Sequence, residues 1–368
     1  MSGAKKIIIS GGGTGGHIFP AIAIADALKK RDPSVEILFV GAKGRMEMDK
    51  VPEAGYRIVG LPVAGFQRRL TMKNITFSFK LAASMIKAKK IVRKFNPDVV
   101  VGVGGYASGP VLRAAASKGI PTVLQEQNSY PGVTNKILGR KAKRVCVAYP
   151  KMDRFFPPSR IVVTGNPVRN SLLSHVDRNL AYSELGLHPN RKTILVVGGS
   201  LGARSINNGI REGIQRIADR DNIQMIWQCG GIYYVEMQQI NGIKNVSNIK
   251  LVPFISQMGF AYAVADVVVS RAGAGTISEL ALLGKAAVLV PSPNVAEDHQ
   301  TKNAMALVKD GAALLVTDKD AEKKLVTTAL SLIDDDFYRD QLKRKIKKFA
   351  YPHSADKIAN EIEKVAML

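Results

Sequence analysis

The stretch Asp266-Val-Val-Val-Ser-Arg-Ala-Gly-Ala-Gly-Thr-Ile-Ser-Glu279 indicates how the whole chain folds. Its apolar start predicts a buried strand over residues 266–270, followed by a glycine-rich turn over 271–275 and a helix from Thr276 onward. The N-terminus of such a helix offers N–H groups and a positive dipole end, which bind phosphate oxygens. Glu279 could accept hydrogen bonds from a ribose diol. These residues alone equally allow a capping box, in which Thr276 and Glu279 satisfy the helix's own amides.

Three further glycine-rich turns follow predicted buried strands, and each leads into a predicted helix. They span residues 11–17, 102–109 and 198–202. Strands that alternate with helices in this way predict a parallel, doubly wound α/β sheet in each half of the chain. Because open α/β sheets bind ligands at the carboxyl ends of their strands, we expect the site in a crevice between the two halves.

The length of 368 residues predicts two domains, because one hydrophobic core rarely extends through so long a chain. The sequence Gly165-Asn-Pro-Val-Arg169 is typical of the joint between them. We therefore expect a first domain over residues 1–163 and a second over 164–349. A final helix within 350–368 is expected to pack back on the first domain.

Two features bear on the compartment. Cys146 and Cys229 fall in different halves, both within apolar strands, which predicts buried free thiols in a reducing environment. The chain has no apolar run of the ~18 residues that a membrane span requires, and its N-terminus lacks a signal-peptide pattern. We expect a cytosolic protein, or one that binds a membrane from the cytosolic side.

The formal charge of +23 implies a negatively charged partner, either nucleic acid, anionic lipid or a phosphorylated substrate. No acidic residue occurs between Glu53 and Asp98, and a basic helix is expected over 73–95. Its predicted buried face consists of Leu81, Met85, Ala88, Val92 and Phe95. The apolar residues ahead of this face are Phe66, Leu70, Met72, Ile75, Phe77 and Phe79. This pattern suits an anionic bilayer surface, with a solvated basic face as the alternative. Nucleic acid fits less well, because no stacking aromatics or groove-binding motif are apparent.

The first glycine turn contains the G-x-G-x-x-G pattern at Gly11, Gly13 and Gly16. A dinucleotide-binding fold also needs an acid at the end of the second strand, where this chain has Gly41-Ala-Lys43. The sequence therefore argues against a nicotinamide or flavin cofactor. His17 directly follows the glycines, so its ring is expected at the mouth of the crevice as a functional group.

Polar residues also cluster where other predicted strands end. Gln125-Glu-Gln-Asn128 is one such cluster and Glu297-Asp-His-Gln300 is another. The triplet Asp334-Asp-Asp336 matches the Asp-x-Asp pair of metal-dependent sugar transferases, but it falls in a polar break between late helices and is interpreted as a solvated cap. Helix dipoles and Arg169 could neutralise a leaving diphosphate without a metal. A P-loop lysine pattern is absent, which disfavours phosphoryl transfer.

Seven motifs, in order along the chain, resemble those of the MurG family, the UDP-GlcNAc transferases that convert lipid I to lipid II in peptidoglycan synthesis. They lie at residues 11–17, 102–109, 126–128, 165–169, 198–200, 271–279 and 298–300. Each motif is weak alone, but seven in register over nearly the whole chain are highly specific. The resemblance implies a GT-B fold, in which two Rossmann-like domains with doubly wound parallel sheets face each other across a cleft. It also implies an inverting mechanism with no essential metal or cofactor.

Carried over residue by residue, the resemblance assigns the UDP-GlcNAc site to Thr14, Gly15, Gly16, Asn128, Arg169, Ser200, Ile255, Ala274, Gly275, Thr276, Ile277, Ser278, Glu279 and Gln300. In this assignment the backbone of Ile255 meets the uracil and Glu279 the ribose. Ser200 and the helix start at Gly275 meet the diphosphate, and Gln300 meets the sugar hydroxyls.

The same carry-over assigns the acceptor side to His17, Tyr106, Glu126 and Asn135. His17 is the expected general base, which deprotonates the 4-hydroxyl of MurNAc, and Glu126 is the alternative base. The first domain is thus expected to bind the acceptor and the membrane, and the second to bind UDP-GlcNAc.

The resemblance also implies partners and a location. The expected partners are UDP-GlcNAc, undecaprenyl-linked lipid I and an anionic membrane surface, with other cell-wall synthesis proteins as further candidates and no nucleic acid. The expected location is peripheral, on the cytoplasmic face of the inner membrane. Two alternatives remain open: another GT-B transferase with a lipid acceptor such as diacylglycerol, and a non-catalytic basic scaffold bound to the membrane. A UDP-GlcNAc 2-epimerase fits less well, because a reaction on the donor alone would not explain the basic, apolar first domain.

Overall fold

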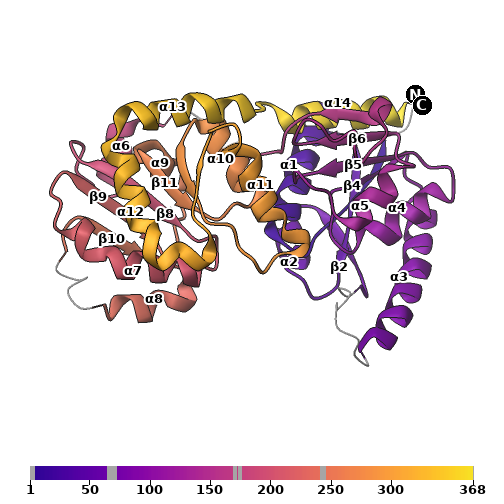
Figure 1. Ribbon diagram of the computed structural model, residues 1–368. Coiled ribbons are helices and arrows are strands. Elements are labelled where there is room, and N and C mark those ends of the chain that lie inside the picture. Colours follow the sequence, from indigo (N-terminus) through magenta and orange to yellow (C-terminus); the bar gives the residue numbers. More distant parts are fainter. Residues whose placement is uncertain (1–4, 64–72, 169–171, 173–175, 241–245, 368) are drawn as a thin grey trace. The chain divides into compact units, whose positions relative to one another are not determined.

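The computed structural model describes residues 5–63, 73–168, 172, 176–240 and 246–367 (Figure 1). The chain divides into two compact units, Met1–Val168 together with Tyr351–Leu368, and Arg169–Ala350. Each unit contains its own sheet, and every strand pair in both sheets is parallel. The doubly wound parallel α/β architecture predicted from the sequence is therefore confirmed in each unit.

The sheet of the first unit has the strand order β3-β2-β1-β4-β5-β6-β7. Its strands are β1 (Lys6–Ser10), β2 (Glu36–Ala42), β3 (Arg57–Leu61), β4 (Val99–Gly102), β5 (Thr122–Glu126), β6 (Arg144–Val147) and β7 (Ile161–Val163). The order reverses between β1 and β4, which pair with Ser10 opposite Gly102. The turns after these two strands therefore emerge together at the carboxyl edge, at the switch point where open α/β sheets bind ligands.

Helices cover both faces of this sheet, because alternate residues of a strand point to opposite sides. Ile7 and Ile9 of β1 lie in a core with α1 (Gly15–Arg31) and α14 (Ser354–Ala366). Ile8 lies in the opposite core with α3 (Lys73–Phe95) and α4 (Ser108–Ala116). The other helices described here are α2 (Glu47–Glu53), η1 (Pro158–Arg160) and α5 (Val133–Gly139). The final helix α14 packs against α1, and Arg31 and Glu363 form an ion pair of 2.9 Å between them.

The sheet of the second unit has the order β10-β9-β8-β11-β12-β13. Its strands are β8 (Lys192–Val197), β9 (Ile223–Gln228), β10 (Ile249–Val252), β11 (Val267–Ser270), β12 (Ala286–Leu289) and β13 (Leu314–Leu315). The order reverses between β8 and β11, where Val197 lies opposite Ser270. The turns at residues 198–202 and 271–273 therefore start side by side, so this unit repeats the arrangement of the first.

The second unit contains helices of its own. They are α6 (Arg178–Glu184), α7 (Arg204–Ala218), α8 (Gly231–Gln238), α9 (Met258–Val264), α10 (Ala274–Leu283), η4 (Ala296–Asp298), α11 (His299–Val308), η5 (Asp318–Asp320), α12 (Ala321–Asp334), α13 (Asp336–Ile346) and η6 (Lys347–Phe349). Gly213 lets α7 approach α12, since a Cβ there would lie 2.5 Å from the Cβ of Val326. Cys229 in this unit and Cys146 in the first are buried and free, as predicted for the side chains of both residues.

Three helices start earlier than the sequence predicts. Helix α1 begins at Gly15, inside the turn predicted over residues 11–17. Helix α10 begins at Ala274 rather than Thr276, and α4 begins at Ser108 rather than Pro110. The glycines are typical of turns, but Gly109 and Gly275 lie within the first helical turns. Pro110 fits the first turn of α4, because the amide that proline lacks would have no intrahelical partner there.

The basic helix α3 has the predicted bounds but a shorter buried face. Ala88 and Val92 are buried, whereas Leu81, predicted to be buried, is 41% exposed and Ile86 is 70% exposed. The α3 residues in the core beside the sheet are Ala88 and Val92, with Ile91 and Phe95 packed against them. The apolar periodicity of α3 therefore predicts a longer buried face than the structure shows. Phe66, Leu70 and Met72, as well as the side chains of Ile75, Phe77 and Phe79, lie outside the described residues. None of the described helices is both long and apolar enough to cross a bilayer.

Candidate active site

The glycine loop after β1 holds His17 at the switch point of the first sheet. Thr14 is the N-cap of α1, so Gly15, Gly16 and His17 form its first turn. The ring Nδ1 of His17 lies 3.1 Å from the carbonyl oxygen of Gly12 and 3.3 Å from the hydroxyl of Thr14. Because a carbonyl can only accept, the closer contact assigns a proton to Nδ1 and leaves the lone pair of the neutral ring on Nε2.

The loop after β4 borders the other side of the His17 ring. Gly104 has φ +94°, and a Cβ at this position would lie only 2.8 Å from Nε2 of His17. A side chain at residue 104 would therefore displace the imidazole. Tyr106, two residues further along this loop, is 54% exposed. The structure thus brings His17 together with the loops of two neighbouring strands.

Glu126 lies at the end of β5 with its carboxylate surrounded by donors. The Oε1 atom accepts from the backbone N–H of Asn128 at 2.9 Å and from its side-chain amide at 3.1 Å, while Oε2 accepts from Asn135 at 2.8 Å. Burial raises the pKa of Glu126, and these hydrogen bonds act in the opposite direction. Asn135 is also buried, so the predicted acceptor residues Glu126 and Asn135 bind each other.

Glu47 is a buried acid of this site that sequence reasoning missed. Its side chain comes from the first residue of α2 and is only 1% exposed. Its Oε2 accepts from the backbone N–H of Gly13 at 2.9 Å, and its Oε1 accepts from that of Ala42 at 2.9 Å. The sequence signal for Glu47 is an acid that follows the second predicted strand shortly after Gly41-Ala-Lys43.

The start of helix α10 presents the backbone amides of a helix N-terminus in the second unit. Gly273 is the N-cap and makes no side-chain cap bond, so Ala274, Gly275 and Thr276 supply the first turn. The side chain of Ile277 is only 2% exposed, so this residue can meet a ligand through its backbone alone. Ser278, also assigned to the donor site, donates from its hydroxyl to the carbonyl of Ala274 at 3.0 Å.

The capping box proposed for residues 276–279 is wrong, because Thr276 lies inside the helix rather than at its N-cap. The carboxylate of Glu279 instead accepts a hydrogen bond of 3.0 Å from the hydroxyl of Tyr262, on α9. Tyr262 thus orients Glu279 from a neighbouring helix. Sequence reasoning had no signal for this contact, since the two residues lie on separate elements.

The turn after β8 adds Ser200 beside the start of α10. Ser200 is exposed, and Gly202 follows it with φ +78°. A Cβ at Gly202 would lie 1.9 Å from the carbonyl oxygen of Cys229, so only glycine fits. Because β8 and β11 are paired neighbours, the sheet brings Ser200 and the first turn of α10 to the same edge. Ile255, in the loop after β10, is 7% exposed, which leaves its backbone as the group that can meet a ligand.

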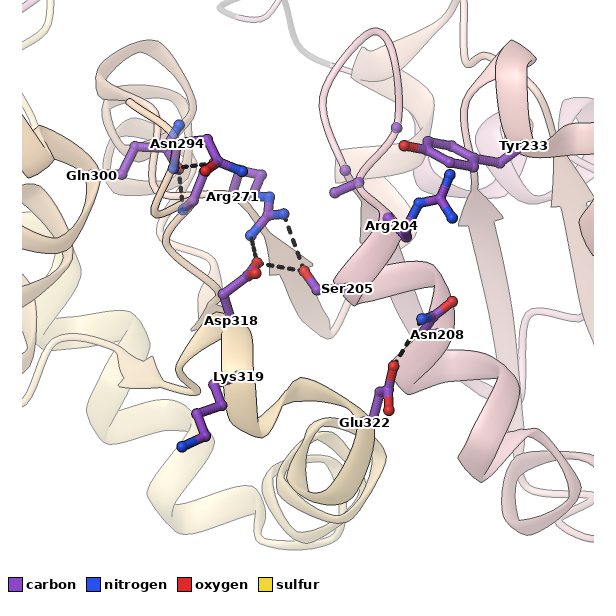
Figure 2. A pocket seen from close by; sticks show the side chains of 14 residues that line it. Arg204, Ser205, Asn208, Tyr233, Arg271, Asn294, Gln300, Asp318, Lys319 and Glu322 are labelled. Carbon is purple, nitrogen blue, oxygen red and sulfur yellow. Dashed lines mark hydrogen bonds and ion pairs between the residues drawn. The ribbon is translucent and has the colours of Figure 1, made fainter. Parts of the chain in front are cut away.

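A pocket of about 730 Å³ opens within the second unit (Figure 2). Arg271 lies at its centre and donates to Asp318 at 2.5 Å, to Ser205 at 3.1 Å and to the carbonyl of Val290 at 3.0 Å. The Oε1 atom of Gln300, at the rim, accepts from the backbone N–H of Ser292 at 2.9 Å (Figure 2). The Arg271 guanidinium therefore ties together the ends of β11, β12 and β13 and the start of α7.

The remaining predicted residues divide between the units. Thr14, Gly15, Gly16 and Asn128 belong to the first unit, whereas the other described donor residues belong to the second. Arg169 lies outside the described residues.

The interpretation of the aspartate triplet as a cap is confirmed for Asp335, the N-cap of α13. Asp335 accepts from the backbone N–H of Tyr338 at the start of α13, and Asp334 pairs with Arg220 at 2.8 Å. Among the residues that the structure describes, no group of three or more His, Cys, Asp or Glu side chains could hold a metal ion.

Comparisons with known proteins agree with this geometry. The glycosyltransferase family 28 N-terminal domain matches residues 7–147, and the glycosyltransferase family 28 C-terminal domain matches residues 193–360. A Parabacteroides distasonis protein named UDP-N-acetylglucosamine--N-acetylmuramyl-(pentapeptide) pyrophosphoryl-undecaprenol N-acetylglucosamine transferase is 57% identical over 98% of each chain. A Bacteroides fragilis protein of the same name is 54% identical over 99% of this chain and 96% of its own. The crystal structure of Acinetobacter baumannii MurG is similar with a TM-score of 0.79 at 29% identity, over 98% of this chain and 99% of that one.

This chain belongs to the MurG family. The MurG resemblance inferred from the seven motifs is thereby confirmed, and so is the GT-B fold class with its two Rossmann-like units. The glycosyltransferase class predicted from the sequence is confirmed as well. Glu47 and the contacts of Arg271 with Asp318 and Ser205 are additions that only the structure supplies.

Proposed function

We propose that this MurG-family chain transfers GlcNAc from UDP-GlcNAc to the 4-hydroxyl of MurNAc in lipid I, forming the β-1,4 linkage of lipid II. The observation that carries this proposal is the 57% identity, over almost the full length, with a transferase of that name. The two switch-point sites described above support it, because each unit offers the groups that one substrate requires.

The second unit is proposed to bind the donor. The first-turn amides of α10 bind the diphosphate together with Ser200, since helix N-termini stabilise anions. Glu279, held by Tyr262 at 3.0 Å, accepts hydrogen bonds from the ribose hydroxyls. Arg169 and the amides neutralise the charge that develops on the departing UDP, which is the main electrostatic requirement of this reaction.

Ile255 and Gln300 are proposed to bind the uracil and the GlcNAc group of the donor. The backbone of Ile255 recognises the uracil, in keeping with its buried side chain. The carboxamide of Gln300 meets the GlcNAc hydroxyls through its nitrogen, because its oxygen binds the loop at Ser292.

The first unit is proposed to supply the base. The Nε2 atom of His17 takes the proton of the MurNAc 4-hydroxyl, the oxygen forms a bond to the anomeric carbon, and the bond from that carbon to UDP breaks with inversion. The Nδ1 contact with Gly12 supports this role, because it leaves Nε2 as the accepting nitrogen. Glu126 fits the role less well, since three donors already occupy its carboxylate. Glu126 with Asn135 and Tyr106 is proposed to shape the acceptor side.

The acceptor is membrane-linked, so we propose peripheral binding to the cytoplasmic face of the inner membrane through α3. Leu81 and Ile86 are exposed on this helix, and so are Lys87, Lys89 and Lys90. Apolar side chains that enter the interface beside ammonium groups that meet lipid phosphates are typical of such surfaces.

The test of the reaction begins with binding of UDP-GlcNAc against UDP-glucose, NADH and DNA. Transfer is then measured to a soluble lipid I analogue and to diacylglycerol. We expect selective binding of UDP-GlcNAc and transfer to the lipid I analogue alone. Transfer to diacylglycerol would instead identify another lipid-directed GT-B enzyme, and binding of vesicles without transfer or hydrolysis would identify a scaffold.

The base is tested by His17→Ala, for which kcat should fall by about 100-fold or more, as general bases typically contribute that much. A loss below about tenfold would contradict the assignment to His17. Glu126→Gln, assayed in parallel, separates the two candidate bases.

The membrane surface is tested by replacing Leu81 and Ile86 together with serine. Binding to vesicles that contain anionic lipid should weaken by about tenfold or more, because two aliphatic side chains no longer enter the interface. Ile232→Ser is the matched control, since Ile232 is 72% exposed but lies on α8 of the second unit. Equal losses in both variants would count against α3 as the membrane surface.

A further inference from the structure

The buried carboxylate of Glu47 contacts neither the donor nor the acceptor in the proposed mechanism. It is 1% exposed, and its two oxygens accept from the amides of Gly13 and Ala42, each at 2.9 Å. Both amides belong to segments outside α2, although Glu47 is the first residue of that helix. The two amides lie after β1 and at the end of β2, so the carboxylate joins the glycine loop to the neighbouring strand.

The carboxylate also fixes the backbone on which His17 depends. Gly12 has φ +146°, and a Cβ at this position would lie 2.2 Å from Oε1 of Glu47. Gly105 closes the other side, since a Cβ there would lie 2.3 Å from the carbonyl oxygen of Gly12. The Gly12 peptide is therefore confined between Glu47 and the loop after β4, and its carbonyl points at Nδ1 of His17 at 3.1 Å.

We propose that Glu47 is a positioning residue for the transfer step and acts through His17. Its carboxylate holds the glycine loop in the shape in which the Gly12 carbonyl accepts from Nδ1–H. That hydrogen bond selects the tautomer and the ring orientation that direct Nε2 to the acceptor hydroxyl. The inference rests on the proposed function, in which His17 is the general base.

This role differs from that of the acid in dinucleotide-binding folds. In dinucleotide folds, the acid at the end of the second strand accepts from a ribose. In this chain the acid follows that strand by a few residues, and its carboxylate binds amides of the protein itself. An acid near the end of the second strand thus positions a catalytic side chain here, whereas in dinucleotide folds it binds the cofactor.

The test is a double-mutant cycle in the full-length protein, with kcat measured at saturating UDP-GlcNAc and lipid I analogue. Glu47→Gln keeps the shape of the side chain but replaces one accepting oxygen with an NH₂ group, which cannot accept from an amide. We expect kcat to fall by about tenfold or more in the wild-type background, since misplacing a catalytic group by about 1 Å has costs of this size. In the His17→Ala background, the same substitution should change the residual kcat by less than about twofold.

Glu53→Gln is the matched control on the same helix. Glu53 is 58% exposed and pairs with Lys50 on the surface, so its replacement should leave kcat unchanged in both backgrounds. Gly105→Ala is the second variant, and it displaces the Gly12 carbonyl without altering Glu47. Its effect should also disappear when His17 is absent, which keeps the test valid even if Glu47→Gln does not fold.

The outcomes separate the two claims. Equal losses from Glu47→Gln with and without His17 would overturn the positioning role while leaving His17 as the base. Full activity of Glu47→Gln would overturn it as well. A His17→Ala enzyme within about tenfold of wild type would overturn both the base assignment and this inference.

Discussion

The contact of Arg271 with Asp318 gives a prediction whose size follows from the structure. Asp318→Asn keeps the shape of the side chain but removes the charge that faces the Arg271 guanidinium at 2.5 Å. The Asp318 carboxylate also accepts from the hydroxyl of Ser205 at 2.5 Å. The side chain of Arg271 is only 17% exposed and that of Asp318 is 29% exposed, so water cannot fully replace the lost partner.

The expected cost is about 2 kcal/mol of unfolding free energy, because a charged hydrogen bond contributes about 1.5–3 kcal/mol and partial exposure keeps the loss below the 3–5 kcal/mol of a fully buried pair. For a unit of this size, that loss lowers the Tm by about 4–8 °C. Differential scanning calorimetry of the full-length variant measures the shift.

Ser205→Ala and the double variant complete the cycle. Because both side chains bind the same guanidinium, the two losses should be non-additive by about 0.5 kcal/mol or more. Asp340→Asn is the control, since Asp340 is 62% exposed and its pair with Lys343 lies on the surface, and it should change stability by less than about 0.5 kcal/mol. An Asp318→Asn variant as stable as this control, or fully additive losses, would refute the account of Arg271 as the group that ties these loops together.

Three further predictions follow from single contacts. Tyr262→Phe removes the donor to Glu279, which should weaken UDP binding about fivefold in a calorimetric titration, as a net hydrogen bond contributes about 1 kcal/mol. Burial lowers the pKa of Lys285 from 10.5 to about 8. Between those pH values the unfolded chain therefore binds more protons than the folded protein, so the free energy of unfolding rises with pH. In urea unfolding, the free energy of unfolding of the wild type should rise by about 1–3 kcal/mol relative to that of Lys285→Met as the pH rises from about 8 to 10.5. Gly104→Ala places a Cβ against the ring of His17 and should lower kcat about tenfold or more while UDP binding is unchanged.

Each of these predictions has a matched control. Tyr338→Phe changes a half-exposed tyrosine on α13 and should leave UDP binding unaltered. Lys309→Met replaces a surface lysine and should give a stability difference that does not vary with pH. Gly119→Ala carries the same strain of a positive φ as Gly104→Ala, but its Cβ would meet nothing within 4 Å, so it should lower stability without lowering kcat. An effect of a control equal to that of its partner would contradict the corresponding contact.

The sequence predicted the elements of the fold well, because they depend on local patterns. Apolar runs that end in glycine turns identified the strands β1, β4, β8 and β11, and the bounds of α3 agreed with its helical periodicity. Local patterns gave wrong predictions of burial where the packing of a helix on the sheet determines which side chains are exposed. Leu81 has the spacing of a buried residue, yet it is 41% exposed and is not part of the core cluster that contains Ala88 and Val92.

The sequence by itself determined which residue types stand at the ends of the strands, and so it determined the class of chemistry. The two switch points follow from the strand orders, which only the tertiary structure shows. Tertiary structure alone decided which partners hold those residues. Tyr262 donates to Glu279, Asp318 accepts from Arg271, and Glu47 accepts from amides of the glycine loop and of β2. The physical reason is that a hydrogen bond depends on distance and angle in space, whereas these partners come from separate elements, as far as 47 residues apart for Arg271 and Asp318. Burial likewise arises only after the sheet and helices have packed, so the environment that makes each contact strong has no signature in the local sequence.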